Sequence, residues 1–280
     1  MPLGLKDLDD TQAPLLDHLI ELRGRLVKAV LALIVAFGVC FYFADQIFGF
    51  LVRPLTAAFP EGEGQLIYTR LYEAFFVEIK VALFAAFFLA FPIIANQLWG
   101  FVAPGLYKTE KKAFLPFLIA TPVLFFAGGA LAYYVVMPLA FTWFLGFQGN
   151  AGGLNAQALP AMGDYLDLVM RFILAFGASF LLPVLLMLLN MAGIVSRAQL
   201  VSARRYVIVA VFVVAALITP PDVVSQLMLA GPLIVLFEGS LVLMLLSEKK
   251  ATKLAAGEDA AESQTAVEKG SAEATGKQAE

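Results

Sequence analysis

Two acidic side chains stand among basic ones in polar stretches that border long apolar runs. Glu21 lies in HLIELRGRL (18–26), and Glu110 lies beside three lysines in FVAPGLYKTEKK (101–112). A carboxylate can accept an arginine guanidinium through two parallel hydrogen bonds, a geometry that lysine does not reproduce. Two such carboxylates on one surface would suit a pair of arginines, whereas the alternative is ordinary solvated charge. The residues alone leave both interpretations open.

Side chains that could perform catalysis are few. The 280 residues include one histidine, His18, and one cysteine, Cys40, which lies inside an apolar run. No HExxH motif, pair of intramembrane aspartates or serine–histidine pair within an apolar segment is present, so an intramembrane enzyme is not predicted. A single cysteine excludes an internal disulfide and a CxxC metal site. We therefore expect no catalytic residue, no metal and no cofactor.

The elements that must position the two carboxylates are membrane spans. The chain is 61% hydrophobic and 15% charged, which is far from the composition of soluble domains. Six apolar segments lie near 27–47, 77–99, 114–137, 168–191, 206–220 and 224–246. Most reach the roughly 20 residues that cross a bilayer, but the fifth has only about 15. We predict an all-α membrane protein with six transmembrane helices in a curved, cup-like bundle, with short fifth and sixth spans.

Basic residues predict the orientation of these spans. Lysine and arginine concentrate in the N-terminal arm, in loops 100–113 and 192–205, and just after residue 248, whereas loops 138–166 and 220–223 have none. The positive-inside rule then places both termini in the cytoplasm. No large basic surface remains, so nucleic acid is not an expected partner.

Three domains follow from this organisation. Residues 1–26 form a cytoplasmic amphipathic arm, and residues 27–248 form the six-span transmembrane domain. Residues 249–280 are rich in alanine and acidic residues, and the part from residue 251 accounts for the whole net charge of −3. This composition predicts a disordered cytoplasmic tail.

Ionisable residues inside the spans are candidates for function or for snorkelling to the headgroups. Lys80, Arg171 and Glu238 are such residues. No chain of carboxylates or histidines crosses the middle of the bundle, which disfavours a proton-coupled transporter. A small-solute or ion secondary transporter therefore remains only as the alternative function.

Four stretches closely resemble the TatC family, the core subunit of the twin-arginine protein translocase. They are HLIELRGRL (18–26), NQLWGFVAPGLYKTEKK (96–112), FFAGGALAYYVVMPLAF (125–141) and LITPPDVVSQ (217–226). They occur in the family's order and spacing across residues 15–248. The resemblance implies a multi-pass plasma (inner) membrane protein of bacterial type. It would bind twin-arginine signal peptides at its cytoplasmic face and nucleate a translocon that exports folded proteins, driven by the proton-motive force.

The resemblance also implies roles for individual residues at the signal-peptide site. Glu21 and Glu110 match the acidic pair that binds the two arginines of the signal peptide. Three further residues match neighbours of that site: Leu22, Arg23 and Phe101.

Other matched residues lie at the later spans and on the external side. Pro54 and Asp222 match external positions associated with function. Thr219 and Gln226 match a polar cluster where the single-span partners TatA and TatB dock, and a polar group that faces lipid there is costly unless a partner helix satisfies it. The family also implies a homo-oligomer within a receptor complex. Leu181 departs from the family because some members carry a glutamate at that position in the fourth span.

Overall fold

The computed structural model describes the backbone of residues 9–59, 64–106, 111–151, 154–219 and 222–276. Side chains are described over residues 19–59, 64–101, 116–149, 157–219 and 222–249. These parts of the chain are almost wholly helical. The helices are α1 (Asp9–Tyr42), α2 (Ala44–Thr56), α3 (Glu73–Leu106), α4 (Lys111–Leu131), the π-helix η1 (Ala132–Val136), α5 (Met137–Leu145), α6 (Met162–Ser179), α7 (Leu182–Met191), α8 (Arg197–Ser202), α9 (Arg204–Ile218) and α10 (Val223–Gly276). The strands β1 (Gly149–Ala151) and β2 (Leu154–Ala156) pair as an antiparallel hairpin.

Five described segments are long and apolar enough to cross a membrane. They are Leu19–Tyr42, Glu73–Phe101, Pro116–Leu145, Met162–Met191 and Val223–Lys249. The predicted all-α membrane fold is therefore confirmed. The predicted fifth span corresponds to α9, which has only 15 residues, and its crossing stays a prediction.

The sixth span is not short, contrary to the prediction. Val223–Lys249 has 27 residues, enough for about 40 Å of helix. The structure also differs from the predicted disordered tail, because α10 continues without a break to Gly276. Alanine, glutamate and lysine dominate this extension, and these residues favour helix wherever no proline interrupts them. Low hydrophobicity therefore did not mark the end of the helix.

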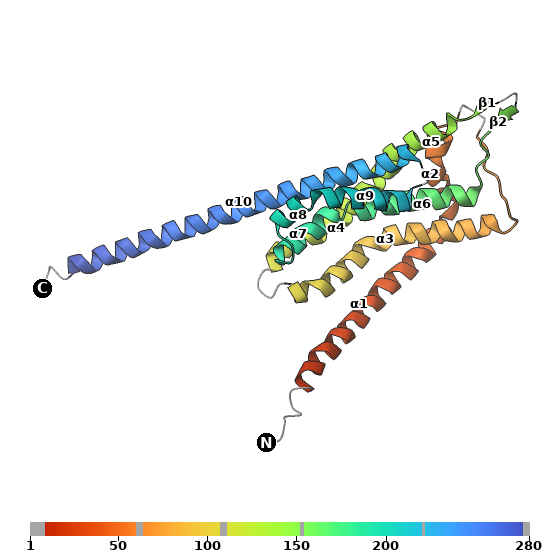
Figure 1. Ribbon diagram of the computed structural model, residues 1–280. Coiled ribbons are helices and arrows are strands. Elements are labelled where there is room, and N and C mark those ends of the chain that lie inside the picture. The colour runs from red at the N-terminus through yellow and green to blue at the C-terminus, as the bar shows by residue number, and fades with distance from the viewer. Residues whose placement is uncertain (1–8, 60–63, 107–110, 152–153, 220–221, 277–280) are drawn as a thin grey trace, which may run out of the picture.

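The two ends of the bundle carry different elements (Figure 1). The hairpin of β1 and β2, together with α2, α5 and the start of α10, lies at one end. The end of α3, the start of α4 and α8 lie at the other end, toward which α1 extends its N-terminus. Consecutive long helices thus connect opposite ends, as successive membrane crossings require.

The centre of the bundle is formed by α6. Its Phe172 and Phe176 are among the largest fully buried side chains of the described chain. The neighbouring α4 approaches closely because glycines face the crossing. A Cβ atom on Gly128 would lie 2.5 Å from the carbonyl oxygen of Phe176, and one on Gly177 would lie 2.8 Å from the Phe125 ring. Small residues at helix crossings are how membrane helices gain close packing.

A carboxylate joins the two connecting segments at the end that carries the hairpin. Glu73 accepts hydrogen bonds from the backbone N–H groups of Thr69 and Gly163, at 2.7 and 2.8 Å. A parallel β-bridge between Ile67 and Ala161 lies beside it. The start of α3 and the start of α6 are therefore held together where the two apolar spans begin.

Candidate functional site

Helices α1 and α3 position the candidate site, and small residues let them pack along each other. Ala36 and Cys40 of α1 form a buried cluster with Ala82, Ala86 and Ala90 of α3. The three alanines recur at every fourth residue and thus share one face of α3. Small side chains on that face allow the two backbones to approach. This contact determines where the polar ends of both helices meet.

Glu21 of α1 lies at that polar end and already holds an arginine. The Nε and Nη2 atoms of Arg25 donate to the same oxygen, Oε1 of Glu21, at 2.9 and 2.6 Å. The Arg25 guanidinium also lies directly against Gly100 of α3, where any Cβ atom would collide with it. Glu21 and Arg25 are partly exposed, with 37% and 28% of their side chains accessible. The Glu21 carboxylate is therefore held in place by Arg25 and is still accessible to a ligand.

The residues predicted to neighbour Glu21 divide between α1 and α3. Leu22 and Arg23 follow Glu21 on α1 and are exposed. Phe101 follows Gly100 on α3 and is half-buried. The structure thus brings Glu21 to the part of α3 that carries Phe101. Glu110 lies outside the described residues, immediately before Lys111, the first residue of α4.

Arg25 was not predicted as part of the site. The signal that could have found it is its spacing from Glu21, because residues four apart share a helix face and favour an ion pair. The contact with Gly100 had no such signal, since it depends on how α1 crosses α3.

Pro54 lies buried within α2, at the end opposite Glu21. Proline has no N–H group, so the carbonyl four residues earlier, that of Phe50, lacks its helical donor. The Tyr133 hydroxyl of η1 donates to this carbonyl at 2.6 Å, and the Tyr165 hydroxyl of α6 donates to the next one, that of Leu51, at 2.8 Å. Pro54 therefore creates an acceptor that joins α2 to η1, a role that the sequence did not indicate.

Asp222 caps the start of α10. Its Oδ1 atom accepts a hydrogen bond of 2.7 Å from the backbone N–H of Ser225, the third residue of the helix. This is the usual arrangement of an N-cap carboxylate, which satisfies a free donor and complements the helix dipole. Oδ2 of Asp222 and the Ser225 hydroxyl are buried without a hydrogen-bond partner among the described residues.

The polar residues at the α9–α10 junction bond within the chain. The Thr219 hydroxyl donates to the Ala215 carbonyl at 2.9 Å, and Thr219 is only 6% exposed. Gln226 is half-buried, and its Nε2 donates to the Phe212 carbonyl of α9 at 3.1 Å. Thr219 therefore needs no partner helix to satisfy its hydroxyl, and its part in the docking of a partner stays a prediction. Gln226 keeps a partly accessible polar group beside α9.

Leu181 stands at the break between α6 and α7, which Pro183 follows. It is half-buried and packs against the cluster formed by Phe91, Ala95 and Phe125. The surroundings of Leu181 are thus apolar.

Two of the charges expected inside the spans, Lys80 and Glu238, have partners that the sequence did not indicate. Lys80 pairs with Asp167 of α6 at 2.9 Å, and Glu238 of α10 pairs with Arg204 of α9 at 2.8 Å. Each pair joins two helices that are far apart in the sequence or connected by a turn. Mutual pairing, rather than snorkelling alone, accounts for these charges within or near the bilayer.

Comparisons with known proteins agree with this architecture. The model of the family described as Sec-independent protein translocase protein (TatC) matches residues 17–232. A Sec-independent protein translocase protein TatC of Magnetococcus marinus is 51% identical over 251 residues, which cover 90% of this chain and 91% of the relative. The protein of the same name from Escherichia coli K12 is 43% identical over 231 residues, which cover 82% and 87%.

A solved structure shows the same fold. The crystal structure of the twin-arginine translocase receptor TatC in DDM superposes with a TM-score of 0.72 at 38% identity, covering 81% of this chain and 98% of the solved one. The region that the family model matches, residues 17–232, contains Glu21, Phe101 and Gln226. On these grounds the chain, a multi-pass membrane protein, belongs to the TatC family of Sec-independent protein translocase subunits.

Proposed function

We propose that this subunit binds the twin-arginine signal peptides of folded cargo where α1 meets the end of α3. The observation that carries the proposal is the Arg25 guanidinium, which Glu21 holds against Gly100. A planar guanidinium thus fits beside this carboxylate in the protein's own structure. The arginine of a signal peptide would make the same charge-assisted contact in place of Arg25.

Two carboxylates are needed for two arginines, and Glu110 is the second. It follows α3 by four residues and directly precedes α4 in sequence. Phe101, half-buried on α3, would offer apolar contact to the signal peptide. Leu22 and Arg23 are exposed beside Glu21, where they would border the bound segment.

This end of the bundle would face the cytoplasm, with both termini on the same side. Basic residues in the adjoining loops support that orientation. The membrane would be the inner membrane of a bacterial-type cell. Bound cargo would then nucleate a translocon with TatA and TatB, within a receptor complex of several copies, and the proton-motive force would drive transport.

TatA and TatB would dock on α9 near Gln226. Exposed apolar side chains form a stripe along α9, at Val209, Val213 and Leu217. Gln226 lies beside α9 and retains a partly accessible amide. A partner helix could cover the stripe and bond this amide, whereas the Thr219 hydroxyl already bonds within its helix.

Peptide binding in nanodiscs tests the signal-peptide site. A fluorescent twin-arginine peptide should bind at least about tenfold more tightly than its twin-lysine counterpart. Glu21→Gln and Glu110→Gln should each remove most of that preference, because the amide keeps the shape of the side chain but loses the charge. Glu78→Gln is the matched control, since Glu78 lies near the start of α3 at the opposite end.

The control variant should keep the full preference for arginine. Equal binding of the two peptides, or an undiminished preference in both site variants, would mean that recognition lies elsewhere. Binding of the twin-arginine peptide to the Glu78→Gln variant would show that the purified protein is folded and able to bind, whichever result the site variants give.

A further inference from the structure

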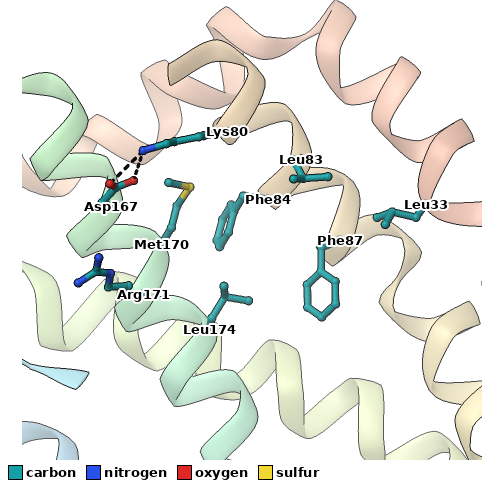
Figure 2. Close-up of a pocket in the computed structure, with 9 residues that line it drawn as sticks. All are labelled: Leu33, Lys80, Leu83, Phe84, Phe87, Asp167, Met170, Arg171 and Leu174. Carbon is teal, nitrogen blue, oxygen red and sulfur yellow. Dashed lines mark hydrogen bonds and ion pairs between the residues drawn. The ribbon is translucent and has the colours of Figure 1, made fainter. Parts of the chain in front are cut away.

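An open groove of about 510 Å³ lies between α1, α3 and α6 (Figure 2). Its floor is apolar, and three charged residues stand at one end. The apolar lining consists of Leu33, Leu83, Phe84, Phe87, Met170 and Leu174. The charged residues are Lys80, Asp167 and Arg171. The groove therefore has the two-part character of an amphipathic ligand site.

The three charges leave one positive charge in excess. Both oxygens of Asp167 bond to Lys80 Nζ, at 2.9 and 3.0 Å, so these two residues neutralise each other. Arg171 lies one helical turn beyond Asp167, is exposed, and forms no ion pair with any other described residue. An exposed cation within a membrane span requires a counter-ion or access to water.

Lys80 and Arg171 both lie in the first third of their candidate spans. Lys80 lies seven residues, or about 10 Å, from the start of α3 at Glu73. Arg171 lies nine residues, or about 13 Å, from the start of α6 at Met162. The apolar lining continues beyond both charges, deeper into the spans, at Phe87 and Leu174.

We propose that this groove binds one anionic phospholipid of the phosphatidylglycerol class. Its phosphate would pair with Arg171, and an acyl chain would lie on Phe84, Phe87 and Leu174. The charge argues for this occupant, because a single phosphodiester balances the one unpaired cation. An apolar partner helix would cover the floor of the groove but would remove water from Arg171 without supplying a counter-ion. Burying an unpaired charge in this way is unfavourable. The site is separate from the signal-peptide site and does not depend on the function proposed there.

Native mass spectrometry of the purified full chain tests the proposal with two lipid probes. Phosphatidylglycerol and phosphatidylcholine of the same acyl chains are added at equal concentration. One bound phosphatidylglycerol should be favoured about fivefold, the effect of one arginine near an anionic headgroup. Arg171→Gln should abolish the preference and Arg171→Lys should retain part of it. The matched control is Arg205→Gln, which removes an exposed arginine from α9 and should leave the preference unchanged.

A second measurement locates the lipid without any substitution. Phosphatidylglycerol with a photoreactive group on its acyl chain should crosslink to the peptides of α3 and α6 that contain Phe87 and Leu174. Crosslinks found only elsewhere would overturn the proposal. So would equal binding of the two lipids, or a preference that survives in Arg171→Gln. A twin-arginine peptide could also displace the lipid. If it did so equally well from the wild-type protein and from Arg171→Gln, the groove would be assigned to the peptide instead.

Discussion

At the scale of single residues, the ion pair between Arg25 and Glu21 defines the candidate site in the absence of a signal peptide. The Arg25 guanidinium bonds to one oxygen of Glu21 and lies against Gly100. A signal-peptide arginine would have to share or replace this contact. The competition is modest, because a partly exposed pair one helical turn apart contributes only about 0.5 kcal/mol. Arg25 would thus compete only weakly with a signal-peptide arginine for this carboxylate.

Arg25→Gln should therefore strengthen binding of the twin-arginine peptide slightly. Loss of a 0.5 kcal/mol competitor corresponds to about twofold. Fluorescence titration in nanodiscs measures the change, and Lys28→Gln, which also removes one cation from α1, is the control. A tenfold loss of affinity in Arg25→Gln would show instead that Arg25 holds Glu21 in its binding geometry.

The bond between Tyr133 and Phe50 provides a second test at this scale. Tyr133→Phe keeps the ring but leaves the Phe50 carbonyl without its donor, which should lower the free energy of unfolding by about 1–2 kcal/mol. In a Pro54→Ala background the new N–H at residue 54 can serve that carbonyl, so the same change should cost about 1 kcal/mol less. Thermal unfolding of the four proteins in detergent completes the cycle. Additive effects would mean that the missing proline N–H does not explain the contact.

At the scale of elements, the α1–α3 packing decides whether the site forms. Glu21 is on one helix and Phe101 on the other, and the stripe of Ala82, Ala86 and Ala90 sets their alignment. The stripe is about 15 residues from the polar end of α3. A change there would act on peptide binding only through the placement of the helices.

Ala86→Leu should weaken both stability and peptide binding. Ala86 is fully buried against α1, and the added volume should cost about 1–3 kcal/mol. Ala127→Leu adds the same volume at an exposed position of α4 and should change neither property. Thermal unfolding and twin-arginine peptide titration report the two effects. If Ala86→Leu lowered stability but left peptide binding unchanged, the site would not depend on the packing of α1 against α3.

Sequence patterns predicted the helices better than the contacts between them. Runs of about 20 apolar residues identify spans because hydrocarbon thickness sets their length. The end of α10 escaped prediction because polar helix formers extend a helix as readily as apolar ones. The Glu21 carboxylate was found from its surroundings in the chain. The Gly100 contact and the Tyr133–Phe50 bond join residues that are 75 and 83 positions apart, which no local pattern encodes.

At the scale of the whole molecule, orientation and the number of crossings decide which end meets cargo. The proposed signal-peptide site lies at the end where α3 finishes, and the hairpin and the start of α10 lie at the other. Lysine and arginine in the loops predict that the site end is cytoplasmic. The shortest predicted crossing is α9, whose 15 residues give only about 22 Å of helix. Thinning of the bilayer beside it would let it span.

Three cysteine variants in a Cys40→Ala background test both points. A membrane-impermeant maleimide applied to intact cells should label Tyr68→Cys, which lies before α3, and Val223→Cys, at the start of α10. Both positions are exposed, and the six-span topology predicts that both are external. Ser202→Cys, just before α9, should react only after permeabilisation, because the same topology predicts that it is cytoplasmic. The comparison across α9 is the informative one. If Val223→Cys behaves like Ser202→Cys while Tyr68→Cys labels, then α9 does not cross and the chain has five spans. Labelling of Ser202→Cys alone in intact cells would mean that the protein has the opposite orientation in the membrane. The Glu21 end would then face away from the cytoplasm, where signal peptides could not reach it before export.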